Sequence, residues 1–267
     1  MWGKTILILY LVSNLSIVSA IQDRVSESDS ITQSIAADIY QQFLAVHKTL
    51  TPLENPDAET LNRVGWRVIN AVKKYPVSKK TAKEMESFAW ELNLVAEKKM
   101  DAWCFPAGKI VVYSSLLPIT QSDASLAVVL SHEIAHTLLK HGDNRMKQYL
   151  KEFLGGKNLS TALSAKPVET KDFFKMAYAN GDYVGVIRGF DPSDEMAADQ
   201  LGAVFCAMAG YNPVECTVFW ERMRRFSGTG REPELISSHP VDEKRILWLR
   251  ENMEDVARIY YKPISKK

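Results

Sequence analysis

Apolar residues recur at helical spacing in two early segments of the chain. In residues 57–74, Leu61, Val64 and Val68 lie three or four positions apart, and residues 34–49 show a similar pattern. Residues at this spacing line one face of a helix, so both segments are predicted to be helices. We interpret both as scaffold.

The period changes from helical to alternating near residue 88. Apolar residues occupy every second position over 88–94, which is typical of a strand. Residues 99–105 and 109–113 flank Pro106-Ala107-Gly108, so they are predicted to form a hairpin. A small sheet in an otherwise helical chain predicts an α+β fold that is predominantly helical.

A third pattern carries chemistry, because His132, Glu133 and His136 form an HExxH motif inside an apolar helical run. Ser122 is placed to cap the start of this helix, and Gly142 to end it in a left-handed conformation. Histidines four apart share a helical face, about 40° apart around the axis, so both reach one metal ion. The pattern is typical of zinc-dependent peptide hydrolysis. The alternative is two solvated histidines on a surface helix.

Two histidines need a third protein ligand, with the fourth position left for water. One class of zinc peptidases takes a histidine six residues past the second motif histidine, but Gly142 stands there and excludes that class. His141 is five residues past His136, about 140° around the helix, and is expected to interact with the dipole at the helix end.

A glutamate on a separate helix is the other common third ligand. Asp191 and Pro192 have the form of an N-cap followed by proline at the first helical position. Glu195 and Asp199 share one face of the helix that begins there. We interpret Glu195 as the third ligand and Asp199 as the acceptor of the proton on a ligand histidine. The alternative is that acidic residues merely favour a helix N-terminus.

The order of the motifs resembles that of a known family. The similarity covers residues 88–253 and consists of Asp101–Gly108, the HEIAH helix, Glu195–Gly202, Ala209–Pro213, and Ser238-His239-Pro240 followed by Arg245. The chain resembles the zinc metalloendopeptidases that include the CAAX prenyl endopeptidases, HtpX and the Oma proteases. That family usually has asparagine where this chain has Asp101, and glycine where it has Ala107.

The resemblance implies a gluzincin-type zinc peptidase domain with one Zn2+ per chain. His132, His136 and Glu195 would bind the metal, Glu133 would be the general base, and Asp199 and Arg245 would support the ligands. The partner is a polypeptide substrate, which we expect to add as a strand to the sheet edge that borders the cleft. The predicted substrate-binding residues are Asp101, Ala102, Trp103 and Cys104, with burial in the core as the alternative for Trp103.

His239 has three interpretations. As a loop residue beside a helix cap, it would have no part in catalysis. Near the metal, it would either donate a hydrogen bond to the oxyanion of the tetrahedral intermediate or occupy the fourth zinc position and hold the enzyme latent. The same position in the family lies near the zinc, so we favour a catalytic His239 that donates to the oxyanion.

The first residues of the chain predict a location. Residues 1–4 are short and basic, residues 5–12 are mostly apolar, and Val18-Ser19-Ala20 suits signal cleavage. We therefore predict a signal peptide over residues 1–20 and an exported enzyme, either periplasmic or secreted. An uncleaved segment would instead anchor the enzyme in a membrane.

The rest of the chain is predicted to be one catalytic unit. Residues 21–33, rich in Ser, Asp and Gln, are predicted to be a flexible leader, and residues 34–267 a single metallopeptidase domain. Residues 143–190 would be an insertion between the two ligand helices, either a helical lid over the cleft or a passive loop. Cys206 and Cys216 could pair across the turn at Gly210, with simple burial as the alternative.

The net charge of the chain limits the kinds of partner that it is expected to bind. The chain has 33 Lys and Arg residues against 32 Asp and Glu residues, a net charge of +1. This balance predicts no recruitment of nucleic acid or of an anionic surface. Two rival functions remain: an aminopeptidase, for which no amine-binding motif is recognisable, and a non-catalytic binding or chaperone module on the same fold. The intact set of His132, Glu133, His136 and Glu195 favours the endopeptidase.

Overall fold

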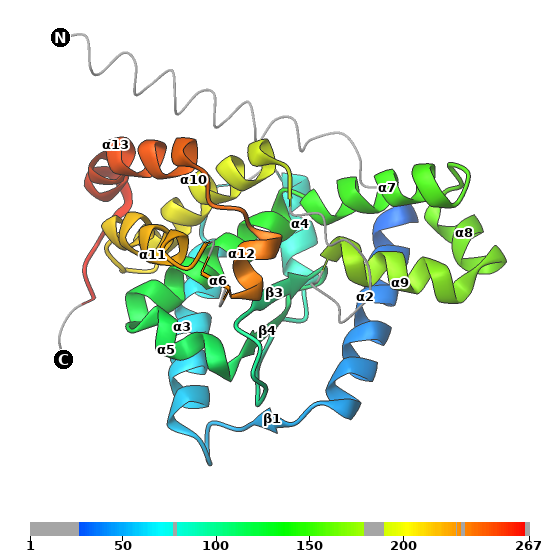
Figure 1. Ribbon diagram of the computed structural model, residues 1–267, viewed down its shortest axis with the longest axis horizontal. Helices are drawn as coiled ribbons and strands as arrows, with labels where there is room; N and C mark the ends of the chain where they lie inside the picture. The colour runs from blue at the N-terminus through cyan, green and yellow to red at the C-terminus, as the bar shows by residue number, and fades with distance from the viewer. Residues whose placement is uncertain (1–26, 77–78, 179–189, 228, 231–232, 265–267) are drawn as a thin grey trace, which may run out of the picture.

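The computed structural model describes residues 27–76, 79–178, 190–227, 229–230 and 233–264 (Figure 1). Helices cover both faces of a four-stranded sheet, which confirms the predicted α+β fold that is predominantly helical. The proposed signal segment, residues 1–20, lies outside the described residues. Among those that are described, no helix combines the length and apolar content needed to cross a bilayer.

The sheet has the order β1-β2-β4-β3, with strands β1 (Thr49–Leu50), β2 (Glu91–Val95), β3 (Ala102–Phe105) and β4 (Lys109–Tyr113). β2 and β4 are parallel, and the other neighbouring pairs are antiparallel. The predicted hairpin joins β3 to β4, with Ala107 (φ 66°) and Gly108 (φ 76°) both left-handed. A Cβ on Gly108 would lie 2.7 Å from the ring of Trp90, so this position requires glycine.

One face of the sheet packs on the larger of the two cores, whose helices include those that carry the proposed metal ligands. The helices of this core are α3 (Pro56–Val72), α6 (Asp123–Leu138), α10 (Pro192–Met208), α11 (Val214–Arg224) and α13 (Glu243–Tyr260). Helix α6 lies at the centre of this core and is buried from Ser125 to His136. A Cβ on Gly202 of α10 would lie 3.1 Å from the backbone of His132, so the lack of a side chain permits the close approach of the two helices.

The opposite face of the sheet packs on a second core. Its helices are α2 (Glu27–Val46), α7 (His141–Phe153), α8 (Leu159–Ala165) and α9 (Pro167–Tyr178), which Figure 1 shows on the side away from α11 and α13. The described part of the predicted insertion is therefore mostly helical. Residues 179–189 lie outside the described part of the chain, and a lid function of this insertion stays a prediction.

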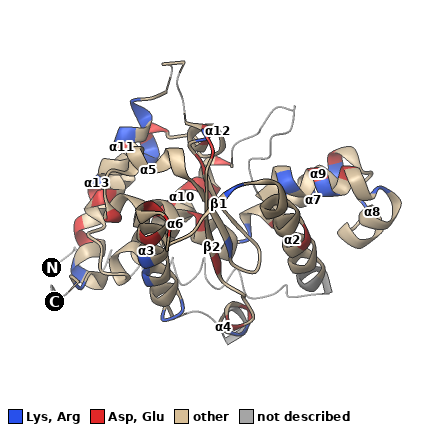
Figure 2. Cartoon of the chain, turned by 90° about the horizontal axis from the view of Figure 1, so that it is seen from below, with Lys and Arg blue, Asp and Glu red and all other residues tan. Residues whose placement is uncertain are grey.

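Short elements complete the fold. They are α4 (Lys79–Glu86), the 3-10 helix η1 (Ser114–Leu116), α5 (Leu117–Thr120) and α12 (Glu234–Ser238). Acidic and basic residues are interspersed along the same helices, such as α9 and α13, rather than collected by sign (Figure 2).

Two local predictions were wrong. Helix α2 begins at Glu27, so residues 27–33 are helical rather than part of a flexible leader. The first turns of this helix are polar and lack an apolar face of their own. Ile35 and Ile39, further along the same helix, are buried against the sheet, and this packing stabilises the helix as a whole. At the end of α6, Lys140 rather than Gly142 is left-handed (φ 59°), and Gly142 lies inside α7, where its missing side chain makes room for the ring of Tyr178.

Candidate metal centre

Helix α6 presents His132 and His136 on one face, as its sequence spacing requires. The Ser122 hydroxyl oxygen accepts a hydrogen bond from the backbone N–H of Ser125 at 3.1 Å, so the helix begins at the predicted cap. Both histidines are buried, and their Nε2 atoms lie 3.0 Å apart. The alternative of two solvated histidines is therefore wrong.

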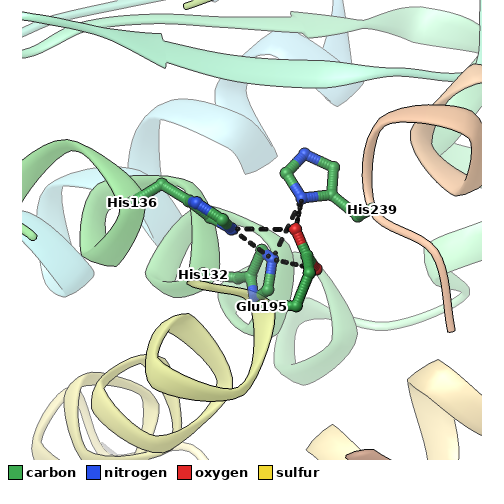
Figure 3. Close-up of side chains that lie close together, drawn as sticks. All are labelled: His132, His136, Glu195 and His239. Carbon is green, nitrogen blue, oxygen red and sulfur yellow. Dashed lines mark hydrogen bonds and ion pairs between the residues drawn. The ribbon is translucent and has the colours of Figure 1, made fainter. Parts of the chain in front are cut away.

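Glu195 reaches the same point from the first turn of α10. Asp191 is the N-cap of this helix and Pro192 occupies its first turn, as predicted. The Glu195 carboxylate oxygens lie 3.4 Å from Nε2 of His132 and 3.4 Å from Nε2 of His136. The two helices thus bring three donor side chains to one point (Figure 3).

His239 provides a fourth donor atom from the loop that follows α12. Its Nδ1 lies 3.2 Å from Nε2 of His132 and 2.9 Å from Oε1 of Glu195. The four donor atoms lie within 4.8 Å of one another, and all four residues are buried. Zinc–nitrogen distances of about 2.0–2.1 Å place adjacent donors of a tetrahedron about 3.3–3.4 Å apart. The separations among His132, His136 and Glu195 are 3.0, 3.4 and 3.4 Å, so these three donors fit a zinc ion.

Asp199 and Arg245 form a buried layer behind the donors. Oδ1 of Asp199 lies 3.1 Å from Nδ1 of His132, the ring nitrogen that faces away from the cluster. Arg245 donates to both Asp199 oxygens, at 2.6 and 2.9 Å, and its Nη1 lies 2.6 Å from Oε2 of Glu195. Burial alone would raise the pKa of Glu195, but Arg245, His239 and His136 hold that pKa well below its usual value. The carboxylate is thus kept in its charged form, which a metal ligand requires.

Glu133 lies beside the donor set rather than in it. Its Oε1 is 3.3 Å from Nε2 of His239, and its side chain is buried. Burial is the largest cause that raises the pKa of Glu133 well above the usual value. A carboxylate with a raised pKa beside a metal position is suited to accept and return a proton.

The edge strand β3 corrects one substrate-binding prediction. Ala102 and Cys104 face the core of α6, whereas Trp103 faces the second core and packs on the rings of Tyr40 and Phe43. The alternation of a strand sends Trp103 away from the donors, so it does not line the cleft. Asp101 is buried and accepts a hydrogen bond from the N–H of Ala102 at 2.9 Å.

The three cysteines are buried free thiols. The structure thus shows the alternative of simple burial for Cys206 and Cys216 rather than a disulfide. Burial raises the pKa of Cys104 to about 12, which leaves its thiol protonated and inert as a nucleophile.

Three residues near the donors were missed by sequence reasoning. Phe190 packs on the ring of His136 in a tilted arrangement with centroids 4.1 Å apart, and the ring centroids of Trp220 and His132 are 4.9 Å apart. No motif marks either aromatic. His141 was assigned to the dipole of the helix end, yet it is buried with its Nδ1 2.9 Å from Nδ1 of His136. The spacing HExxH-x4-H was the available signal. It was misleading because α6 ends before Lys140, so the rotation of 100° per residue does not extend from His136 to His141.

A comparison with family models matches residues 66–253 to peptidase family M48. This chain belongs to that family. The assignment confirms the resemblance to the family that includes HtpX and the Oma proteases, and relatives that the chain matches are named as metalloendopeptidases.

Named relatives cover different shares of the chain. The mitochondrial metalloendopeptidase OMA1 of Schizosaccharomyces pombe is 25% identical over 219 residues, which is 81% of this chain and 59% of that protein. OMA1 of Arabidopsis thaliana is 29% identical over 66% of this chain and 34% of its own length. The beta-barrel assembly-enhancing protease of Escherichia coli K12 is 26% identical over 57% of this chain and 32% of its own. The chain thus spans about a third to three fifths of these relatives.

The comparisons also correct the predicted location. The OMA1 relatives from three organisms that match 66–81% of this chain are named as mitochondrial enzymes. The prediction of an exported, periplasmic or secreted enzyme was therefore wrong. It depended on the composition of residues 1–20 alone, which lie outside the described residues.

Proposed function

We propose that the chain hydrolyses internal peptide bonds of polypeptides, with His132, His136 and Glu195 as zinc ligands and Glu133 as general base. The observation that carries the proposal is the buried cluster of three donors from two helices, whose atoms lie 3.0, 3.4 and 3.4 Å apart. Zinc bound there would polarise a peptide carbonyl and lower the pKa of a water molecule toward about 7.

Three other side chains have separate roles in the proposed reaction: proton transfer, orientation of a ligand histidine and positioning of two carboxylates. Glu133 takes the proton from the attacking water and returns it to the leaving amine, since its carboxylate lies beside the donors without joining them. Asp199 fixes the ring of His132 by accepting its Nδ1 proton. Arg245 fixes the positions of the Glu195 and Asp199 carboxylates through an ion pair with the first and hydrogen bonds to the second.

We propose that an extended substrate binds beside β3, the outer strand of the described sheet. Among the described strands β3 pairs with β4, and α6 lies on its other side, where the Thr137 hydroxyl donates to the carbonyl of Cys104 at 2.7 Å. A peptide that adds along this edge must itself be extended, so we propose unfolded or damaged polypeptides as the substrate class. Backbone recognition of this kind tolerates many side chains.

Metal removal tests the proposal. We expect the purified chain to bind about one zinc ion, to digest casein, and to lose this activity when a chelator removes the metal. Re-addition of zinc should restore cleavage. End-blocked peptides should be cleaved as readily as free ones, since the proposed site binds no terminus. A strict need for a free amino terminus would instead indicate an aminopeptidase, and metal-independent binding without cleavage a chaperone module.

The role of His239 is the second prediction. Its Nδ1 lies at the fourth donor position and its Nε2 lies 3.3 Å from Glu133, so one ring contacts both the donor set and the proposed base. We therefore propose the latent arrangement over oxyanion donation, and expect His239→Ala to keep zinc and to raise turnover. A latched state favoured tenfold would hold activity down about tenfold.

The same variant separates the alternatives. A fall of about 10²-fold in kcat, with zinc content and melting temperature unchanged, would show that His239 donates to the oxyanion. Turnover equal to that of the unmodified chain would leave His239 as a loop residue next to the α12 cap. Single-turnover measurements at saturating peptide give the comparison without interference from substrate binding.

A further inference from the structure

His141 stands outside the proposed ligand set but contacts it. It is the first residue of α7, only 5% exposed, and its Nδ1 lies 2.9 Å from Nδ1 of His136. Nε2 of His136 is the nitrogen that faces the other donors, at 3.0 Å from His132 and 3.4 Å from Glu195. His141 therefore meets His136 at the nitrogen that would not bind the metal.

The positions of the protons follow from this contact. A histidine binds zinc as a neutral ring, so a His136 bound through Nε2 carries its single proton on Nδ1. A hydrogen bond at 2.9 Å then requires an acceptor, which makes Nδ1 of His141 the unprotonated nitrogen of a neutral ring. The proton of His141 lies on Nε2, 3.6 Å from Oδ1 of Asp194.

The two ligand histidines are thus supported in different ways. Nδ1 of His132 faces the Asp199 carboxylate directly, at 3.1 Å. Nδ1 of His136 faces a neutral imidazole, with the Asp194 carboxylate one step behind it. Asp194 precedes Glu195 in α10, so the turn that supplies the third ligand also holds the far end of this chain of contacts.

We propose that His141 is a positioning residue for the metal centre, which fixes the tautomer and ring angle of His136 by accepting its Nδ1 proton. This inference rests on the proposed function, because it requires that His136 bind zinc through Nε2. The contact between His141 and His136 also connects the segment from α7 to α9 with the metal centre. The break at Lys140 turns the start of α7 so that its first side chain points back at α6.

Zinc affinity of three variants, measured by competition with a chromogenic chelator, tests the proposal. Asparagine places an oxygen near the position of histidine Nδ1, so His141→Asn keeps an acceptor for His136, whereas His141→Leu fills the space without one. We expect about 10–100-fold weaker zinc binding for His141→Leu and near-normal binding for His141→Asn. The control is His47→Leu, because Nε2 of His47 lies 3.1 Å from Glu97, away from the donors.

Each outcome decides between explanations. Zinc binding by His141→Leu as tight as that of the unmodified chain would overturn the positioning role. Equal weakening in His141→Asn and His141→Leu would show that the ring matters for packing, not for its acceptor. Failure of the proposed function looks different: His136→Ala would then bind zinc as tightly as the unmodified chain.

A spectroscopic measurement does not depend on a variant that folds. Long-range 15N–1H correlation spectra of the zinc-loaded chain, labelled at histidine, report which ring nitrogen carries the proton. We expect His136 protonated at Nδ1 and His141 protonated at Nε2 alone. A doubly protonated His141, or one protonated at Nδ1, would overturn the proposal even if His141→Leu does not fold.

Discussion

Glu133→Gln is expected to abolish peptide hydrolysis while zinc stays bound. Glu133 is buried beside the donors but is not one of the four residues whose donor atoms lie within 4.8 Å of one another. Glutamine keeps the size and the hydrogen-bonding oxygen of the side chain but accepts no proton in this pH range, so the variant removes the base and little else. Loss of a general base lowers kcat by about 10²–10⁴-fold. Casein digestion and metal analysis on the same sample give both quantities.

The matched control is Glu221→Gln on α11. Glu221 lies on the surface, where it pairs with Arg250 at 2.7 Å. Its replacement by glutamine removes the same charge as Glu133→Gln without contact with the donors. We expect its activity and zinc content to equal those of the unmodified chain. Casein cleavage at the normal rate by Glu133→Gln would show that the base lies elsewhere, and loss of zinc from that variant would make Glu133 a ligand.

Local periodicity was sufficient to predict the core of the site. His132 and His136, and likewise Glu195 and Asp199, lie four positions apart on their helices, and this spacing fixes which side chains share a face. The Ser122 cap marks where α6 begins, and Pro192, which follows the N-cap residue Asp191, marks where α10 begins. The meeting of the two helices could be expected only from the chemistry, because a zinc site needs a third ligand.

Features that depend on a break in periodicity or on the choice of a face could not be predicted in this way. His141 faces His136 because Lys140 adopts a left-handed conformation, which no pattern in the sequence marks. Trp103 alternates correctly with its neighbours, but the sequence does not say which face of β3 meets α6. Phe190 is placed by tertiary contacts, including the hydrogen bond from its N–H to the carbonyl of Ser238 at 3.0 Å.

Glu195→Ala is expected to lose zinc outright, whereas Asp199→Ala should weaken zinc binding by about 10–100-fold. The difference follows from position: Glu195 oxygens lie 3.4 Å from Nε2 of both ligand histidines, whereas Asp199 contacts the outer nitrogen of His132. Metal titration of the two variants gives the comparison. Equal retention of zinc in both would mean that the third ligand is a different residue.

Asp199→Ala is expected to affect folding stability as well as zinc binding, because Asp199 also pairs with Arg245. A second substitution separates the two effects. The guanidinium of Arg245 is buried, 1% exposed, and donates to both oxygens of Asp199, so Asp199→Ala leaves a buried charge without its main partner. Breaking such a pair costs about 3–5 kcal/mol of folding stability. The double variant Asp199→Ala with Arg245→Met removes both charges and should recover part of the melting temperature. Zinc affinity should stay low in the double variant, since neither substitution restores an acceptor for Nδ1 of His132. Recovery of zinc affinity together with stability would instead mean that Asp199 acts only through the fold.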